Sequence, residues 1–355
     1  MRTADPKPTS SNLLKKAILA AAALATAVLP AAAAQKFAGY DRIDIRAEHR
    51  SGLIPGSVWY PAGGHIYTAP VGDSIVFKGT PALIGAAIAE GSYPLVVISH
   101  GSGGNMDGLG WLSSELALRG AMVLAVNHPG STSGDSSPRR SARFAERVWD
   151  LTAALDHVLD DKVFGPHIDP SRIYALGFSL GGDTVLQAMG LQFRAHDLGV
   201  YCAERPAAPG CDFYGAGGVD FRAVDFALTD GNYADPRFAG VVAVDPGWPN
   251  GFTQESVAAM DKPALLINLG SQDTIWPEVN MGEKGANWGT KFRQATFVEI
   301  APAHHFSFLG ICKDGAAELL RDEGEDPICD DPEGSVRSQV HRRVIEATSA
   351  FLGLE

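Results

Sequence analysis

The sequence predicts an α/β fold with a mostly parallel central sheet and helices on both of its faces. Short apolar runs alternate along the chain with longer segments in which apolar residues recur every three or four positions. The short runs are almost continuously apolar, which is typical of strands that are covered on both faces. Strands separated by helices pair in parallel through right-handed crossovers, so this alternation favours a parallel sheet.

The individual elements follow from these patterns. Strands of the sheet are predicted at residues 94–100, 121–126, 172–178, 240–244, 264–269 and 296–300. Helices are predicted at 106–119, 138–161, 181–189 and 335–352. Residues 40–60 alternate more weakly, and we expect them to form antiparallel strands at one edge.

Residues 1–34 are predicted to be a signal peptide that is removed from the mature protein. Lys15 and Lys16 precede a run rich in Ala and Leu, and Ala31-Ala32-Ala33-Ala34 supplies a small-residue cleavage site. The alternative is a membrane anchor, but the run is short for a bilayer span and is broken by Pro30. No other apolar stretch is long enough to span a membrane. We therefore expect an exported protein, periplasmic or extracellular, with no stable membrane span after processing.

Length and composition are those of an ordinary globular protein, and we expect a single domain over residues 35–355. The chain has 355 residues, of which 45% are hydrophobic and 20% charged. Its net charge of -12 argues against a nucleic-acid partner, because phosphate binding needs a basic surface. Residues 190–237 are rich in Gly, Pro and Asp and interrupt the alternation. They are predicted to form an insertion or partial cap over the C-terminal edge of the sheet, the alternative being a surface excursion without a role.

Four cysteines follow the predicted cleavage site: Cys202, Cys211, Cys312 and Cys329. In an oxidising compartment an even number of cysteines indicates disulfides. Pairing of sequence neighbours, 202 with 211 and 312 with 329, is the simplest of the three connectivities. A metal site is not expected, because the chain has no CxxC pair and no close Cys/His cluster.

The central motif is Gly177-Phe178-Ser179-Leu180-Gly181-Gly182, which fits the G-x-S-x-G pattern. A predicted strand precedes it and a predicted helix follows it, as in the nucleophile turn of α/β-hydrolases. Such a turn holds the serine in a strained conformation that exposes its Oγ, and the helix N-terminus favours a developing anion. Ser179 is therefore the predicted nucleophile.

An oxyanion hole is predicted from the loop after an earlier strand, Ser99-His100-Gly101-Ser102-Gly103-Gly104. Its glycines allow backbone N–H groups to turn towards a substrate. The backbone amides of Ser102 and Leu180 are the predicted donors, since one donor usually comes from the residue after the nucleophile. His100 is expected to order this loop rather than to act directly.

The general base and the acid are predicted from chain order, which is Ser, then Asp, then His in hydrolases of this class. The base is His305 or its neighbour His304, with the pattern favouring His305. The acid is Asp273, which follows a clear strand, or its rival Asp245, which ends the preceding strand. We favour Asp273 from the residues alone. His341, in the last helix, is expected to face solvent.

Four aromatic residues lie near the predicted site loops: Trp248, Trp276, Trp288 and Phe306. They either line an apolar pocket for the acyl group or belong to the core.

At these residues the chain resembles the dienelactone-hydrolase-like α/β-hydrolases, specifically the exported branch related to platelet-activating-factor acetylhydrolases. The segments that carry the resemblance are Val58-Trp59-Tyr60-Pro61, 99–104, Asn127-His128-Pro129-Gly130, 177–182 and His305-Phe306-Ser307-Phe308-Leu309. True dienelactone hydrolases have a cysteine nucleophile where this chain has Ser179, so the resemblance does not imply their lactone hydrolysis. In the similar acetylhydrolases the acid follows the earlier strand, so the resemblance implies Asp245 as the acid.

The predicted function is a serine hydrolase that cleaves carboxylic esters through an acyl-enzyme on Ser179, without a metal or an organic cofactor. Its expected substrate is a small-molecule ester or a lipid-like ester. Two alternatives are a non-catalytic binding protein on a hydrolase scaffold and an amidase or peptidase that uses the same triad.

Overall fold

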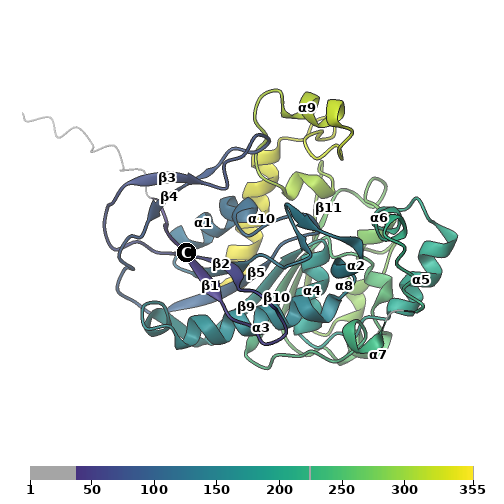
Figure 1. Ribbon diagram of the computed structural model, residues 1–355, viewed down its shortest axis with the longest axis horizontal. Coiled ribbons are helices and arrows are strands. Elements are labelled where there is room, and N and C mark those ends of the chain that lie inside the picture. The colour runs from purple at the N-terminus through teal and green to yellow at the C-terminus, as the bar shows by residue number, and fades with distance from the viewer. Residues whose placement is uncertain (1–36, 224, 355) are drawn as a thin grey trace, which may run out of the picture. The chain divides into compact units, whose positions relative to one another are not determined.

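A computed structural model describes residues 37–223 and 225–354 of the chain. Within these ranges ten strands form one sheet, in the order β12-β11-β10-β9-β5-β6-β2-β1-β4-β3 (Figure 1). The strands are β1 (Gly39–Ile45), β2 (Ile54–Tyr60), β3 (Thr68–Val71), β4 (Thr80–Ile84), β5 (Tyr93–Ser99), β6 (Met122–Val126), β9 (Ile168–Phe178), β10 (Phe238–Val244), β11 (Ala264–Leu269) and β12 (Ala295–Ile300). Two short strands, β7 (Ser131–Thr132) and β8 (Asp135–Ser136), pair separately. The predicted signal peptide lies outside the described residues.

The helices occupy the intervals between the strands. They are α1 (Gly110–Leu118), α2 (Pro138–Ser141), α3 (Phe144–Asp160), α4 (Leu180–Ala188), α5 (Ala195–Glu204), α6 (Cys211–Ala216), α7 (Gln254–Ala259), α8 (Trp288–Lys291), α9 (Ala316–Glu323) and α10 (Arg337–Leu352). Single 3-10 turns are η1 (Asp107–Leu109), η2 (Gly165–His167), η3 (Phe226–Leu228), η4 (Pro249–Gly251), η5 (Pro277–Val279) and η6 (His305–Phe308). No helix in the described part of the chain has the length and the apolar composition to cross a membrane.

The six strands β5, β6 and β9 to β12 are parallel, which confirms the predicted parallel sheet. Strand β9 pairs with β5 on one side and with β10 on the other. The residue that follows β9 therefore lies at the middle of the parallel block, where the ends of neighbouring strands can place side chains around it.

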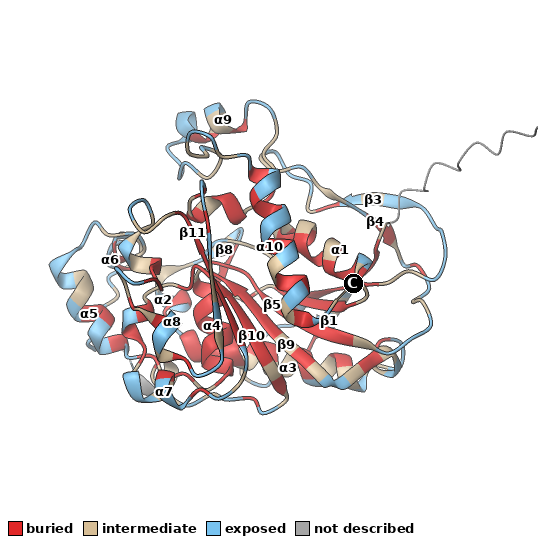
Figure 2. Ribbon diagram, turned by 180° about the vertical axis from the view of Figure 1, so that it is seen from behind, coloured by how far each residue is buried: buried red, intermediate tan, exposed pale blue. Residues whose placement is uncertain are grey.

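Helices cover both faces of the sheet, as the continuous apolar strands predict. Successive residues of β5 pack on opposite sides: Val97 belongs to the core under α3 and α4, and Ile98 to the core under α1 and α10. Helices α1 and α10 lie side by side on their face, and the buried residues of strands and helices fill both layers (Figure 2). Burial on both faces explains why these strands carry no polar stripe.

The antiparallel strands of residues 40–60 are confirmed as β1 and β2, but they are not the edge of the sheet. Beyond β1 lie β4 and then β3, which the sequence analysis did not predict. Both are short and each contains a proline, Pro70 or Pro81. Proline cannot donate to a strand ladder, so it is tolerated at an edge and it hides a strand from pattern analysis.

The predicted disulfides are present as expected, Cys202–Cys211 and Cys312–Cys329. The first joins α5 to the start of α6 within residues 190–237. This segment contacts the loops that follow β10 and β11: the Tyr201 hydroxyl donates to the Glu278 carboxylate, and the Tyr214 ring lies 6.0 Å from the Trp248 ring.

Candidate active site

Ser179 occupies the turn between β9 and α4, with φ 55° and ψ −125°. A positive φ is uncommon for a residue with a side chain and marks a conformation that its surroundings must hold. The glycines on either side explain how it is held. A Cβ on Gly177 would lie 2.0 Å from the Gly181 carbonyl oxygen, and a Cβ on Gly181 would lie 2.0 Å from the Ser99 carbonyl oxygen. The motif therefore consists of glycines because strand and helix touch at backbone distance.

His305 joins the serine to a carboxylate. Its Nε2 lies 3.0 Å from Ser179 Oγ, and its Nδ1 lies 3.1 Å from Asp245 Oδ2. The side chain is 7% exposed and that of Asp245 is fully buried. With the proton on Nδ1 donated to the carboxylate, Nε2 is free to accept the serine proton. The geometry is that of a nucleophile, a base and a group that orients the base.

The structure does not bring Asp273 to this site and places Asp245 beside His305 instead. The Asp273 side chain is 80% exposed and its carboxylate lies 2.5 Å from Lys284 Nζ. Asp273 lies within a tight turn, in which the Thr274 N–H donates to the Ser271 carbonyl. The pairing with Lys284 also lowers the pKa of Asp273. The carboxylate that contacts His305 therefore follows β10 and not β11.

Asp245 is held by a residue that the sequence analysis missed. Its Oδ1 accepts hydrogen bonds from Asn268 Nδ2 and from the Leu269 N–H, each at 2.9 Å. The Asn268 amide also donates to the Val279 carbonyl and accepts from the Met281 N–H. A fully buried asparagine inside the apolar strand 264–269 was the available signal, because a buried amide must find partners.

His304 is fixed as a cap and cannot reach the serine in this arrangement. Its Nδ1 accepts from the Phe306 N–H at 3.0 Å, which caps the turn η6, and its Nε2 donates to the Asp330 carbonyl at 2.5 Å. Both ring nitrogens are therefore occupied by backbone groups. Of the two adjacent histidines, only His305 faces Ser179.

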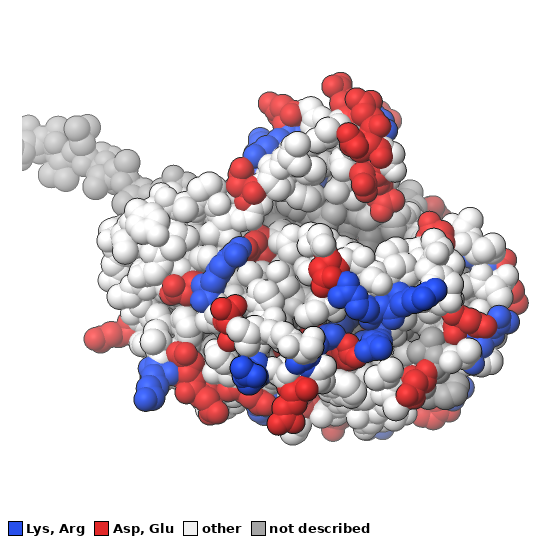
Figure 3. All heavy atoms as spheres, viewed as in Figure 1, with Lys and Arg blue, Asp and Glu red and all other residues white. Residues whose placement is uncertain are grey.

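The residues just after Cys329 anchor the histidine turn, and an acidic segment precedes them. The Ser307 hydroxyl donates to the Asp331 carboxylate at 2.7 Å, and Arg337 of α10 donates to the same carboxylate at 2.9 Å. Figure 3 shows Asp and Glu side chains gathered on this segment around α9; its exposed acidic residues include Glu318, Asp322, Glu323, Glu325 and Asp326. A surface of this sign opposes the approach of anions.

The loop after β5 lies directly beside the serine. A Cβ on Gly101 would lie 3.2 Å from the Ser179 Cβ. Within the described residues, the N–H groups of Ser102 and Leu180 donate to no protein acceptor, which leaves both available to a ligand. The predicted oxyanion donors are therefore unpaired backbone groups, one in the loop beside Ser179 and one on the residue that follows it.

His100 orders this loop, as expected. Its Nε2 accepts from the His128 N–H at 3.2 Å, so its proton lies on Nδ1, which donates to the Gly101 carbonyl at 2.7 Å. That carbonyl belongs to the peptide whose N–H is that of Ser102, and in a trans peptide the two groups point in opposite directions. Burial lowers the pKa of His100 well below its usual range, so the ring is neutral.

Some of the four aromatic residues lie beside the predicted site and one belongs to the core. The Trp276 ring lies 5.0 Å from the His305 ring and packs edge-on against Phe306, and both aromatics are partly exposed. Trp248 is half-buried against Gly210 and Tyr214. Trp288 is fully buried in the core. Trp276 and Phe306 are therefore the aromatics that flank the histidine.

His341 does not face solvent, contrary to expectation. Its ring stacks on Trp111 at a centroid distance of 3.7 Å and its Nε2 donates to the Leu309 carbonyl at 2.9 Å. Burial lowers the pKa of His341 to about 4. Arg342 and Arg343 beside it are exposed and suggest a solvent-facing position, but His341 lies on the side of α10 that packs against Trp111 of α1.

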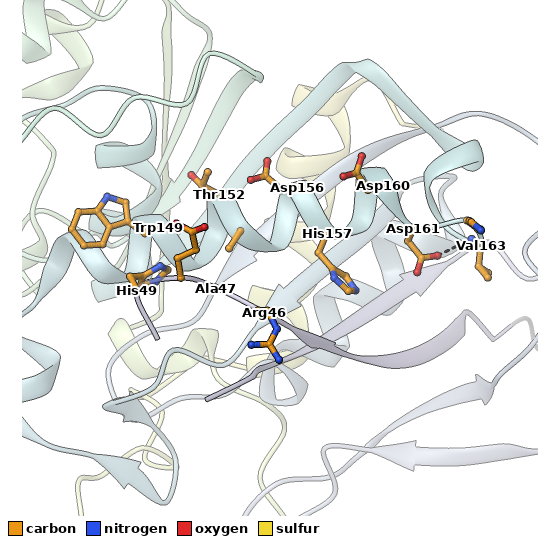
Figure 4. A pocket seen from close by; sticks show the side chains of 13 residues that line it. Arg46, Ala47, His49, Trp149, Thr152, Asp156, His157, Asp160, Asp161 and Val163 are labelled. Carbon is orange, nitrogen blue, oxygen red and sulfur yellow. Dashed lines mark hydrogen bonds between the residues drawn. The ribbon is translucent and has the colours of Figure 1, made fainter. Parts of the chain in front are cut away.

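A separate groove of about 800 Å³ lies between residues 46–49 and α3. Figure 4 shows its lining, with Arg46 on one wall and Asp156, His157 and Asp160 along the helix. None of the predicted site residues lines it, so it is distinct from the Ser179 site.

Comparisons with known proteins show similarity in structure but not in sequence. No model of a protein family matches the chain, and no curated protein matches it. A ferulic acid esterase from Streptomyces cinnamoneus is similar with a TM-score of 0.58 at 18% identity, over 89% of this chain and 88% of that one. A dienelactone hydrolase from Anabaena variabilis gives a TM-score of 0.47 at 13% identity, over 88% and 98% of the two chains. The chain has the α/β-hydrolase fold that its motifs predict.

Proposed function

We propose that this chain is a serine hydrolase that cleaves carboxylic esters through an acyl-enzyme on Ser179. The observation that carries the proposal is the hydrogen-bonded series Ser179–His305–Asp245, with distances of 3.0 and 3.1 Å. The similarity of the fold to that of a ferulic acid esterase is consistent with it. The acid in this proposal is Asp245.

Each residue has one role in the proposed reaction. His305 takes the Ser179 proton as Oγ attacks the ester carbonyl, and the N–H groups of Ser102 and Leu180 stabilise the oxyanion. His305 then protonates the departing alcohol. Water, deprotonated by the same histidine, attacks the acyl-enzyme, and His305 returns that proton to Ser179 Oγ as the carboxylic acid leaves.

The proposed substrates are neutral small-molecule esters, lipid-like ones included. Trp276 and Phe306 provide apolar surface beside His305, and the acidic segment around α9 disfavours anionic substrates. The proposed location is outside the cytoplasm, after removal of residues 1–34. Two disulfides support this location, because disulfides persist in oxidising compartments.

The test is hydrolysis of short p-nitrophenyl esters together with labelling by a fluorophosphonate probe. Wild type is expected to do both, and Ser179→Ala to lose both. Ser338→Ala, an exposed serine of α10, is the control and should behave as wild type. A wild type that neither hydrolyses esters nor accepts the probe would contradict the proposal. Faster cleavage of matched anilides than of esters would instead indicate an amidase.

A further inference from the structure

One buried arginine lies beneath both elements that carry the proposed oxyanion donors. Arg147 belongs to α3, near its start, and is 2% exposed. The donors Ser102 and Leu180 belong to different elements, the loop after β5 and the first turn of α4. A hole built from two elements works only if both are held at one fixed separation.

Towards α4, Arg147 reaches the residue that supplies one donor. Its Nε donates to Thr184 Oγ1 at 2.9 Å, and the Thr184 hydroxyl donates in turn to the Leu180 carbonyl at 2.8 Å. The guanidinium is thus two hydrogen bonds from Leu180.

Towards the other donor, Arg147 holds the loop on both sides of Ser102. Its Nη2 donates to the His100 carbonyl, and its Nη1 donates to Ser131 Oγ at 2.5 Å. The Ser131 carbonyl accepts the Gly103 N–H at 2.9 Å. The same guanidinium therefore bonds directly to His100, two residues before Ser102, and indirectly to Gly103, the residue after it.

The guanidinium also reaches a second buried chain of hydrogen bonds. Its Nη2 donates to Ser99 Oγ at 3.1 Å, the Ser99 hydroxyl donates to His128 Nε2, and His128 Nδ1 donates to Asp150. Burial lowers the pKa of His128 to about 3, so this ring is neutral and serves as a fixed connector.

Arg147 is a cation buried without a directly bonded carboxylate. Within the described residues no Asp or Glu lies within ion-pair distance of it. Asp183 is nearby, but burial raises the pKa of Asp183 well above its usual range, which makes it a poor counter-ion. Burying a charge in this way is costly, and such departures concentrate at functional sites.

We propose that Arg147 is a positioning residue that sets the separation of the two oxyanion donors by bonding the loop of Ser102 and the helix of Leu180 at once. This inference rests on the proposed function. Arg147 does not touch the substrate; it acts through the backbone of both elements.

The test compares Arg147→Met with Arg237→Met. Arg237 is the control, because its side chain is 31% exposed and it bonds to Asp156 of the same helix α3 and to Asp235, with no hydrogen bond to the network of Arg147 or to either donor element. Three quantities are measured on the folded variants: kcat and KM for a p-nitrophenyl ester, and the inhibition constant of a trifluoromethyl ketone, whose adduct with serine carries an oxyanion.

For Arg147→Met we expect kcat to fall about 100-fold, KM to change less than about threefold, and the ketone to bind weaker by the same factor as kcat/KM. For Arg237→Met we expect stability to fall but kcat to stay within about threefold of wild type. A merely structural role for Arg147 predicts the same behaviour for both variants, and that result would overturn the inference.

Two milder variants decide the question if Arg147→Met does not fold. Thr184→Val and Ser131→Ala each remove one hydroxyl that accepts from the guanidinium. Each is expected to lower kcat and ketone affinity together by about five- to tenfold. Unchanged values in both would contradict the inference while leaving the ester hydrolase intact, whereas an inactive, unlabelled wild type would contradict the proposed function itself.

Discussion

At the scale of residues, the site depends on which of several similar side chains faces Ser179. Two histidines are adjacent in sequence, and two aspartates follow adjacent strands. One member of each pair, His305 or Asp245, belongs to the series of hydrogen bonds that begins at Ser179. The other member makes different contacts: His304 caps a turn and Asp273 pairs with Lys284. Mutating the two members of each pair one at a time therefore distinguishes a catalytic role from a local structural role.

The two aspartates are expected to differ by orders of magnitude. Asp245→Asn leaves the shape but removes the charge that orients His305, so kcat/KM should fall about 10³- to 10⁴-fold. Asp273→Asn changes an exposed carboxylate and should stay within about twofold of wild type. Steady-state kinetics with one p-nitrophenyl ester measures both. A larger loss in Asp273→Asn would show that the acid lies after β11.

The two histidines are expected to differ in the same way. His305→Ala removes the base and should lower kcat/KM at least about 10⁴-fold. His304→Ala removes a cap, worth about 1 kcal/mol, and should lower kcat/KM by about tenfold or less as the turn loosens. Comparable losses in the two variants would contradict the assignment of the base.

At the scale of elements, the histidine turn is held from outside the sheet. His304 donates to the Asp330 carbonyl and Ser307 to the Asp331 carboxylate, and both aspartates directly follow the disulfide Cys312–Cys329. Arg337 of α10 donates to the same Asp331 carboxylate. The other disulfide, Cys202–Cys211, closes a loop that has no hydrogen bond to this turn within the described residues. The two bonds should therefore differ in their effect on activity.

Removal of either disulfide is expected to lower the free energy of unfolding by about 2–4 kcal/mol, because each constrains the unfolded chain. Only the double variant Cys312→Ser/Cys329→Ser should also lower kcat, by about tenfold or more, while the protein is still folded. The matched variant Cys202→Ser/Cys211→Ser should keep kcat within about threefold. Urea unfolding and kinetics at low temperature give both quantities. Equal kcat values in the two double variants would argue against the tie to His305.

At the scale of the whole molecule, buried histidines make stability depend on pH. The pKa of His341 is about 4 in the folded protein and near 6.5 in the unfolded chain. Between these values the unfolded state binds the extra proton, so this histidine lowers stability as the pH falls from about 6.5 towards 4 and contributes no dependence above 6.5.

The variant His341→Gln removes that contribution. We expect the free energy of unfolding of wild type to lose about 1 kcal/mol more per pH unit than that of the variant between pH 6 and 5. Denaturant unfolding at pH 7, 6, 5 and 4.5 measures the difference, and taking wild type minus variant cancels the other groups that titrate there. Parallel curves would contradict the burial of this ring.

Most of the fold could be predicted from the sequence, because buried parallel strands and amphipathic helices leave strong local patterns. The six parallel strands and helices α3, α4 and α10 are of this kind. Strands β3 and β4 were missed because proline and short length erase the pattern, and the predicted helix at 138–161 is interrupted between α2 and α3 without a Gly or Pro to mark the break.

Less of the site could be predicted, because it depends on contacts between distant segments. The turn of Ser179 and the loop of Ser102 have local signatures in glycine. The acid has no such local signature: an aspartate after β10 and one after β11 look alike as sequence patterns, and only the family resemblance favoured Asp245, the one that contacts His305. Arg147 gave no signal either, since an arginine in an amphipathic helix usually faces water and this one is buried against the loop of Ser102 and the helix of Leu180.

The most direct test of the Ser179–His305–Asp245 series is to map the adduct of a fluorophosphonate by mass spectrometry of the digested protein. We predict one adduct per chain, on the peptide that contains Ser179, formed rapidly by wild type and by Asp273→Asn and at least about 100-fold more slowly by Asp245→Asn. An adduct on another residue would contradict Ser179 as the nucleophile, and equal rates in wild type and Asp245→Asn would contradict Asp245 as the acid.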